Sequence, residues 1–263
     1  MIHLTIDGRP VEVAAETTAL EAARQAGIAI PTLCYHRALG PNGVCRLCIV
    51  EVEGPGLNRT IATSCNLRVA EGLRIETNSP VIQDMRKTIL ELLLSGMVPT
   101  PELRSLAKQA GVGRRRFKAE PEDQCALCGI CIRTCRDRIG AGALAFGTAG
   151  KSKSKVAEYV TLSKEACIGC GTCAQVCPVG AITIKDKGAE RKILLYGKEA
   201  NRLALVACES CGTPFATERF IDSVLSRLSG ELGAQVKRIC PECARHYYAA
   251  TLAEGFPVDN TAR

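Results

Sequence analysis

The sequence predicts an α+β protein made of several small domains that bind metal. The 263-residue chain contains 16 cysteines, and these fall into four groups of four with none left over. Stretches of alternating apolar residues near the N-terminus predict strands, and two later stretches with apolar residues every three or four positions predict helices. The length suits roughly two domains of ordinary size, so the cysteines are not needed to compensate for a small core.

The first domain, residues 1–78, is expected to be a β-grasp domain. A β-hairpin is predicted at its start because alternating apolar residues flank an Asp-Gly turn. These residues are Leu4, Ile6, Val11 and Val13. Thr18 and Glu21 fit a capping box at the start of a helix. Residues 48–53 and 73–77 are predicted to be further strands.

The first cysteine group lies in a loop of this domain. One early cysteine, a close pair and one distant cysteine give the plant-type spacing of a [2Fe–2S] cluster. The predicted ligands are Cys34, Cys45, Cys48 and Cys65. His36 is expected to be an ordinary loop residue, because a Rieske cluster would need a second histidine near the close pair and none is present.

Residues 79–120 are expected to form a helical linker. Ser79 suits the N-cap and Pro80 suits the first position of a helix, and apolar residues follow at helical spacing. The helix is predicted to end at Gly96, and a proline- and glycine-containing linker is expected from residue 98 onward. The basic run at 114–118 is expected to form a salt-bridging surface toward an acidic subunit.

Residues 121–190 are predicted to form a bacterial-type ferredoxin domain with two [4Fe–4S] clusters. Two runs have the spacing Cys-x-x-Cys-x-x-Cys-x-x-x-Cys, and in proteins with two such runs the fourth cysteine binds the other cluster. We therefore predict that one cluster is held by Cys125, Cys128, Cys131 and Cys177. The other is predicted to be held by Cys167, Cys170, Cys173 and Cys135.

The residues around these runs support the same interpretation. Gly129, Gly169 and Gly171 permit tight turns that bring backbone N–H groups toward the cluster. Pro178 follows the second run as the motif expects, whereas Arg136 stands in the matching place of the first. The stretch 139–145 mimics a dinucleotide fingerprint but follows a cluster ligand directly, so a ferredoxin loop is expected there.

Residues 191–263 are expected to form a zinc-ribbon-like domain. Two Cys-x-x-Cys pairs separated by 28 residues resemble the two knuckles of a zinc ribbon. The four cysteines are Cys208, Cys211, Cys240 and Cys243. An amphipathic helix is predicted between the pairs, over 220–228. Four thiolates leave no open coordination position, which indicates a structural site that favours zinc, with a further iron–sulfur cluster as the alternative.

The formal net charge overstates how basic the metal-loaded protein would be. The formal value of +7, from 34 basic and 27 acidic residues, hints at an acidic partner when taken alone. This count treats every cysteine as neutral. Four sites with four thiolates each would contribute about −8 together and leave the loaded protein near about −1. The basic excess is therefore poor evidence for nucleic-acid binding.

Location and catalysis can also be addressed from the sequence. No Sec-type signal peptide is visible, and the most apolar stretch, 88–98, is too short to span a bilayer. We expect a cytoplasmic protein whose cysteines bind metal rather than form disulfides. The three histidines are scattered and no nucleophile–base constellation is present, so no substrate site of its own is expected.

The order of the domains resembles that in a known family of proteins. It is similar to the N-terminal part of the large iron–sulfur subunit of NADH:quinone oxidoreductase. It is closer still to the small diaphorase subunit of NAD-linked bidirectional hydrogenases and to related subunits of NAD-dependent formate dehydrogenases. The resemblance covers roughly residues 1–190. It is carried by residues 30–34, 45–52, 86–93 and 125–131.

The resemblance implies a non-catalytic electron-transfer subunit of a hetero-oligomeric complex. Its electrons would come from a flavin-bearing NADH-dehydrogenase-like subunit and pass to a catalytic subunit such as a hydrogenase or formate dehydrogenase. The family usually carries a further [4Fe–4S] cluster ligated by one histidine and three cysteines after the second helix. Residues 94–101 contain neither residue type, so that cluster should be absent.

Other interpretations remain open at this point. Residues 205–243 resemble the tail of the ferredoxin-like subunit of formate hydrogenlyase. The chain could also be the iron–sulfur subunit of a benzoyl-CoA reductase-type complex or a free-standing multi-cluster ferredoxin. A rival from another class is an iron–sulfur or zinc sensor that binds nucleic acid through Arg114–Arg116.

Overall fold

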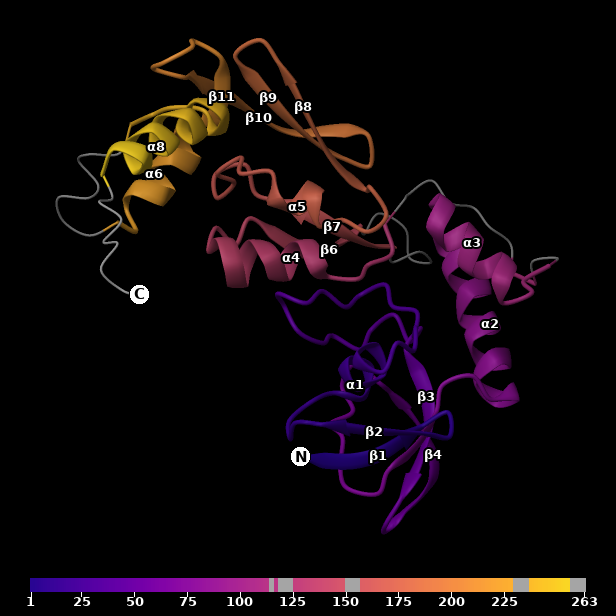
Figure 1. Cartoon of the computed structure of the whole chain (residues 1–263). Coiled ribbons are helices and arrows are strands. Elements are labelled where there is room, and N and C mark those ends of the chain that lie inside the picture. Colours follow the sequence, from indigo (N-terminus) through magenta and orange to yellow (C-terminus); the bar gives the residue numbers. More distant parts are fainter. Residues whose placement is uncertain (114–115, 118–124, 150–156, 229–236, 256–263) are drawn as a thin grey trace, which may run out of the picture. The chain divides into compact units, whose positions relative to one another are not determined.

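The computed structural model describes residues 1–113, 116–117, 125–149, 157–228 and 237–255 (Figure 1). The chain divides into two compact units. The first comprises Met1–Thr161 and Thr172–Ile182, and the second comprises Leu162–Gly171 and Thr183–Arg263. Among the described residues, no helix combines the length and the apolar character needed to cross a bilayer.

The first unit begins with a five-stranded mixed sheet in the order β2-β1-β5-β3-β4. The strands are β1 Ile2–Ile6, β2 Arg9–Val13, β3 Ile49–Gly54, β4 Leu57–Thr63 and β5 Arg74–Glu76. β1 pairs antiparallel with β2 and parallel with β5. Helix α1, Ala19–Gln25, covers the sheet and carries the predicted capping box between Thr18 and Glu21. This arrangement confirms the expected β-grasp domain.

The domain has one apolar core. Leu4, Ile6 and Val13 from the first hairpin lie there with Leu20 of α1 and Ile75 of β5, and each is at most 4% exposed. Cys48 and Cys65 belong to the same buried cluster. The core therefore holds part of the ligand loop rigidly, because close-packed interiors leave little room for side chains to move.

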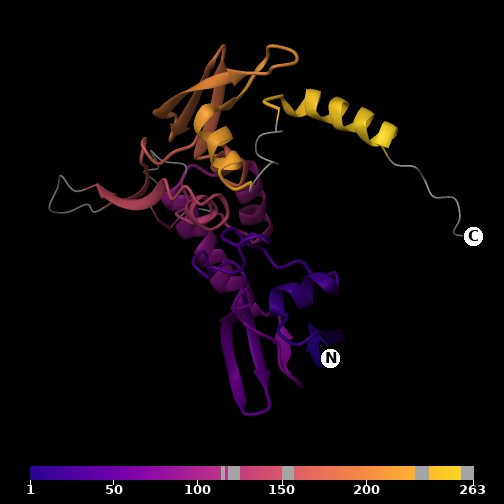
Figure 2. The same cartoon turned by 90° about the vertical axis from the view of Figure 1, so that its left-hand side faces the viewer.

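Strand β4 was not predicted from the sequence. The hairpin that it forms with β3 is drawn in purple in the lower part of Figure 2. Most of its residues are exposed, so the alternation of buried and polar positions that identifies a strand is missing. The only sequence feature that pointed to this hairpin was the Pro55-Gly56 turn between the two strands. Gly56 has a φ of 73°, which suits such a turn.

Two helices follow the sheet in the first unit. Helix α2, Pro80–Gly96, has Ser79 as its N-cap, as predicted. Helix α3, Pro101–Gln109, lies within the region where a linker with prolines and glycines was expected. Thr100 is its N-cap and accepts a hydrogen bond from the N–H of Leu103. Pro101 therefore marks the start of a helix rather than a break in structure.

The ferredoxin-like part contributes further elements to the first unit. These are α4 Ile130–Arg133, the π-helix η1 Thr134–Ile139, β6 Leu144–Ala149, β7 Ala157–Leu162 and α5 Thr172–Gln175. β6 and β7 form a two-stranded sheet. Helix α4 runs directly into η1, and the left-handed residues Gly129 and Gly140 cap the two ends of this continuous helical stretch.

The second unit contains a four-stranded sheet in the order β11-β10-β9-β8. Its strands are β8 Ile182–Lys187, β9 Glu190–Leu195, β10 Lys198–Ala207 and β11 Pro214–Thr217, followed by α6 Glu218–Leu225 and α8 Pro241–Gly255. Helix α6 corresponds to the helix predicted over 220–228. The first Cys-x-x-Cys pair lies in the turn between β10 and β11, whereas the second leads into α8 instead of a second hairpin.

Candidate metal centres

The first cysteine group lies in buried loops of the β-grasp domain. Its members, Cys34, Cys45, Cys48 and Cys65, are between 0% and 9% exposed. The backbone N–H of Cys45 donates to the sulfur of Cys34 over 3.4 Å. Arg46, between two ligands, has a φ of 58°, and this left-handed conformation helps to direct the backbone around the site.

The four thiols form two hydrogen-bonded pairs. A hydrogen bond from the Cys45 side chain lowers the pKa of the Cys34 thiol to about 5, and the same bond raises the pKa of Cys45. Likewise, a hydrogen bond from Cys65 lowers the pKa of Cys48 to about 6, and the pKa of Cys65 is raised. Iron binding would displace the shared protons. The donor set suits a cluster that requires four thiolates.

Backbone carbonyls of Cys48 and its neighbours accept hydrogen bonds from side chains outside the ligand loop. Arg86 of α2 donates to the carbonyl oxygens of Leu47, Ile49 and Thr77 over 3.1, 2.9 and 3.2 Å. Ser64 donates from its hydroxyl to the carbonyl of Cys48 over 2.8 Å. Buried carbonyls need partners, and a guanidinium offers five donors and no acceptor. Arg86 therefore fixes the backbone on both sides of the predicted ligand Cys48.

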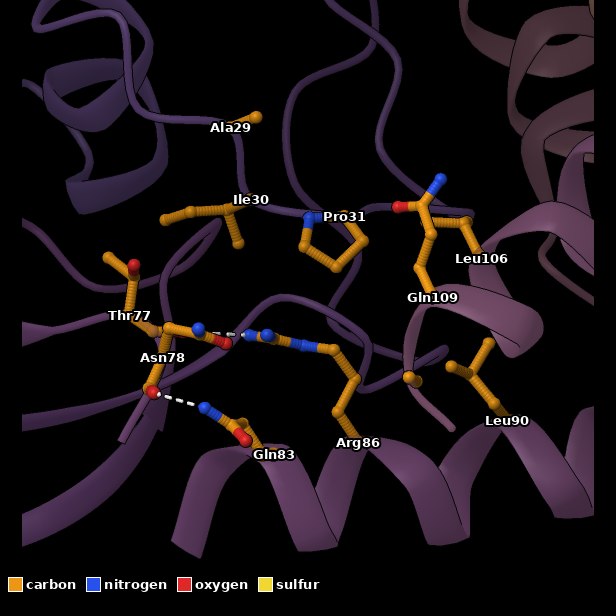
Figure 3. A pocket seen from close by; sticks show the side chains of 11 residues that line it. Ala29, Ile30, Pro31, Thr77, Asn78, Gln83, Arg86, Leu90, Leu106 and Gln109 are labelled. Carbon is orange, nitrogen blue, oxygen red and sulfur yellow. Dashed lines mark hydrogen bonds between the residues drawn. The ribbon is translucent and has the colours of Figure 1, made fainter. Parts of the chain in front are cut away.

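The Arg86 side chain also lines a cavity of about 590 Å³ between the 29–31 loop and helices α2 and α3 (Figure 3). In this view it extends from α2 toward Thr77 and Asn78, beside Gln83. Burial lowers the pKa of Arg86, and the charge of the Cys48 sulfur acts in the opposite direction. Among the described residues, no carboxylate lies within ion-pair distance of this guanidinium.

The second cysteine group gathers with Cys177 in the first unit. Cys128 and Cys131 are 7% and 8% exposed. Burial raises the pKa of Cys128 to about 11 and that of Cys131 to about 12, and the charge of Cys177 contributes to both shifts. The backbone N–H of Leu127, a residue with a φ of 50°, donates to the sulfur of Cys125 over 3.4 Å.

Cys135 is enclosed by the loop that the sequence presents as Gly-Ala-Gly-Ala. The N–H of Ala143 donates to its sulfur over 3.2 Å. The N–H groups of Ala141 and Gly142 donate to its carbonyl oxygen over 3.1 and 3.3 Å. This loop follows a π-helix and surrounds a predicted ligand, as expected for a ferredoxin loop and not for a dinucleotide site.

Hydrogen bonds join the first two ligand loops within the first unit. The side chain of Asn42 donates to the carbonyl of Cys128 over 2.9 Å. Arg133 donates to the carbonyl of Leu39 over 2.5 Å, and Arg138 donates to the carbonyl of Ala38. The charge of Cys34 contributes to the raised pKa of Cys128, so the two cysteine groups are close enough to interact electrostatically.

The members of the third cysteine group belong to different units. Cys167 and Cys170 belong to the second unit, and Cys173 and Cys177 belong to the first. Gly169 and Gly171 have φ values of 71° and 86°, so both occupy the left-handed turns that were expected. The grouping of Cys167, Cys170, Cys173 and Cys135 stays a prediction.

The fourth group forms a compact four-sulfur site in the second unit. Ligand atoms of Cys208, Cys211, Cys240 and Cys243 all lie within 4.8 Å of one another. The sulfurs of Cys211 and Cys240 are 3.8 Å apart. Zinc–sulfur bonds of about 2.3 Å in a tetrahedron place all four sulfurs about 3.8 Å from one another. In a cluster, thiolates bound to different iron atoms lie further apart than the 4.8 Å within which all four sulfurs lie here. The geometry therefore fits a single tetrahedral ion.

The basic run at 114–118 is only partly described. Arg114, Arg115 and Lys118 lie outside the described residues. Arg116 forms a 2.5 Å ion pair with Glu91 of α2, whose side chain is 4% exposed. It also donates to the hydroxyl of Thr88 over 2.9 Å. Arg116 thus neutralises a buried carboxylate of its own chain, which differs from the expected salt bridge to another subunit.

Two family models match the chain. Residues 1–80 match a 2Fe-2S iron-sulfur cluster binding domain, and residues 160–183 match a 4Fe-4S binding domain. These matches agree with the first cysteine group and with the run that begins at Cys167.

Several known proteins are similar to the chain. One of the subunits of an NADH-quinone oxidoreductase of Rhizobium meliloti is 34% identical over 69% of this chain and 24% of its own length. NADPH-Fe(3+) oxidoreductase subunit alpha of Geobacter sulfurreducens is 31% identical over 70% of this chain and 24% of its own length. NADP-reducing hydrogenase subunit HndD of Solidesulfovibrio fructosivorans is 32% identical over 69% of this chain and 36% of its own length.

The aligned region thus spans between about a quarter and about a third of these relatives. A chain from an NAD⁺-reducing [NiFe]-hydrogenase crystallised in the H₂-reduced state is 25% identical, with a TM-score of 0.58. That alignment covers 87% of this chain and 97% of the other. The protein is therefore an α+β iron–sulfur protein, with 2Fe-2S and 4Fe-4S binding domains and a C-terminal four-cysteine group, related to subunits of NADH-quinone oxidoreductases and NAD(P)-reducing hydrogenases.

Proposed function

We propose that the chain is an electron-transfer iron–sulfur subunit of a multi-subunit NAD(P)-linked oxidoreductase. The observation that carries this proposal is the contact between two cluster-ligand loops, made by Asn42 and the carbonyl of Cys128 over 2.9 Å. Two redox sites held this close suit the transfer of single electrons. The relatedness to oxidoreductase and hydrogenase subunits supports the same function.

The proposed cofactors are one [2Fe–2S] cluster, two [4Fe–4S] clusters and one zinc ion. The [2Fe–2S] cluster would be held by Cys34, Cys45, Cys48 and Cys65. Cys125, Cys128, Cys131 and Cys177 would hold one [4Fe–4S] cluster, and Cys167, Cys170, Cys173 and Cys135 the other. The charge of Cys177 contributes to the raised pKa of both Cys128 and Cys131, whereas that of Cys173 contributes to Cys131 alone, and this difference supports the crossed assignment. The closeness of all four sulfurs, which lie within 4.8 Å of one another, supports zinc at the C-terminal site over a further cluster.

When bound, the clusters supply one-electron redox chemistry, and the chain's own residues set the conditions for it. Arg133 and Arg138 keep the 38–40 loop against the helices of the ferredoxin-like part. Backbone N–H groups of Cys45, Leu127 and Ala143 donate to ligand sulfurs. Such hydrogen bonds and burial tune cluster potentials.

The proposed partners are a flavin-containing NADH-dehydrogenase-like subunit and a catalytic redox subunit, such as a hydrogenase or formate dehydrogenase. A benzoyl-CoA reductase-type complex or a free-standing ferredoxin role is the alternative. None of the 16 cysteines forms a disulfide, which fits a reducing cytoplasmic compartment, with any membrane association made through partner subunits.

The function can be tested by co-expressing the chain with a flavin-bearing NADH dehydrogenase subunit from the same organism. NADH should bleach the cluster absorbance of the purified pair but not that of the chain alone. A Cys48→Ser variant should abolish the bleaching of the remaining clusters if electrons enter at the [2Fe–2S] site. Failure of the chain to associate with any flavoprotein would favour the free-standing ferredoxin.

The alternative function, a sensor that binds nucleic acid, predicts a different experimental result. Binding to DNA or RNA in a gel shift at low salt that weakens steeply with added salt would support it. The ion pair of Arg116 with Glu91 already removes one arginine from the basic run on which that alternative depends.

A further inference from the structure

The C-terminal four-cysteine site is connected to the Cys167–Cys170 loop through contacts inside the second unit. The first connection runs through β11. The N–H of Cys208 donates to the carbonyl of Thr213 over 2.9 Å, and β11 starts at the next residue. β11 ends at Thr217, which is 1% exposed. The Thr217 hydroxyl donates to the carbonyl of Ile168 and accepts from the N–H of Phe220.

The second connection starts at the other cysteine pair. Arg238 lies two residues before Cys240, and its carbonyl accepts a hydrogen bond from the N–H of Glu209 over 3.0 Å. Its guanidinium donates to the carboxylate of Glu218 over 2.7 Å. Glu218 is the first residue of α6 and directly precedes Arg219. Both halves of the four-sulfur site are therefore linked to the start of α6.

Arg219 and its neighbours hold the ligand loop. The Nη1 of Arg219 donates to the carbonyl oxygens of Lys164, Glu165 and Cys167 over 2.8, 3.2 and 3.2 Å. Arg191 of β9 donates to the carbonyl of Gly169 over 2.9 Å. Through these bonds the second unit satisfies carbonyls on both sides of the predicted ligand Cys167.

We propose that the Cys208–Cys243 metal site is a structural anchor for the ligand loop of the second [4Fe–4S] cluster. The bound ion fixes the turn before β11 and the segment before α8, and these two segments keep Thr217 and Arg219 on the loop. This inference rests on the proposed cofactors. Loss of the ion releases the loop, so that the cluster ligated by Cys167 and Cys170 is lost while the [2Fe–2S] cluster stays.

The first test uses Cys211→Ser in the full chain, purified anaerobically, because Cys211 is the exposed member of the site. Zinc should be lost, iron should fall from about ten to about six per chain, and the [2Fe–2S] EPR signal should be unchanged. Zinc loss with iron still near ten would overturn the proposal. Wild-type protein without about ten irons would contradict the proposed cofactor set instead.

The second test keeps all 16 cysteines and decides the outcome if the first variant loses every cluster. Arg219→Gln should retain zinc and release iron from one [4Fe–4S] cluster to a chelator at least tenfold faster than wild type. Arg202→Gln is the matched control, since Arg202 of the same unit bonds to the carboxylates of Glu199 and Glu190. Equal release rates for wild type and Arg219→Gln would overturn the anchor.

Discussion

The loops around Cys48 and Cys167 lie in different units, yet an arginine holds each of them in the same way. Arg86 donates to the two backbone carbonyls that flank Cys48 and to that of Thr77, and Arg219 donates to three at or before Cys167. Loops that direct N–H groups toward a cluster leave their carbonyls pointing away, and an arginine has donors but no acceptor. These arginine–carbonyl hydrogen bonds explain how the irregular loops around Cys48 and Cys167 remain ordered.

The two regions differ in what fixes the arginine itself. Arg86 is partly buried and comes from the 17-residue helix α2, whose N-cap and apolar contacts hold it. Arg219 is exposed and comes from the eight-residue helix α6, which is linked to the four-sulfur site. We therefore expect the first loop to depend on ordinary packing and the second to depend on a metal ion.

The largest expected effect concerns which cysteines serve each cluster. Cys177→Ala should remove the cluster held by Cys125, Cys128 and Cys131, with a loss of about four irons per chain. Iron analysis and EPR at several temperatures measure this. If only the signal of the cluster at Cys167 disappears, the crossed assignment is wrong.

A glycine in the second loop provides the next test. Gly169 has a φ of 71°, and an added Cβ would lie 2.7 Å from Cγ2 of Thr217 and 2.8 Å from Cδ1 of Leu203. Gly188, with a φ of 58° and no neighbour within 4 Å of an added Cβ, is the matched control. Gly169→Ala should cost about 1–3 kcal/mol more than Gly188→Ala, because overpacking adds to the backbone strain.

This comparison can be made by chemical denaturation of the second unit in the holo-protein. Equal unfolding free energies for the two alanine variants would mean that the loop is not closely packed on β10 and β11.

Arg86→Gln tests the corresponding contact in the first unit. Leaving buried carbonyls without a donor should destabilise the domain by about 1–3 kcal/mol. Removing a positive charge near Cys48 should also lower the midpoint potential of the [2Fe–2S] cluster, since the reduced cluster is the more negative. Lys87→Gln, which removes a charge from the same turn of α2, is the control and should leave the EPR-monitored potential unchanged.

The smallest effect is expected at the contact between the first two ligand loops. Asn42→Ala removes the hydrogen bond to the carbonyl of Cys128 and should cost about 0.5–1.5 kcal/mol. Asn58→Ala, at an exposed position in β4, should cost less. Thermal unfolding of both variants measures this, and a similar shift for both would show that the contact between the loops contributes nothing.

The cysteine spacing and the caps at Thr18 and Ser79 were readable from the sequence because these signals are local. Helix α3 was missed because Pro101 was interpreted as a linker residue, although Thr100 before it is an N-cap. The sheet formed by β8, β9 and β10 was also missed. Arg86 and Arg219 had no sequence signal as loop-holding residues, because their acceptors are backbone carbonyls up to 39 and 55 positions away.

The central claim is that this chain holds three iron–sulfur clusters and one structural ion. Iron and zinc analysis of the anaerobically reconstituted protein, with EPR of the reduced sample, tests it most directly. The account predicts about ten irons and about one zinc per chain, with signals from both cluster types. A count of about two irons or fewer would contradict it.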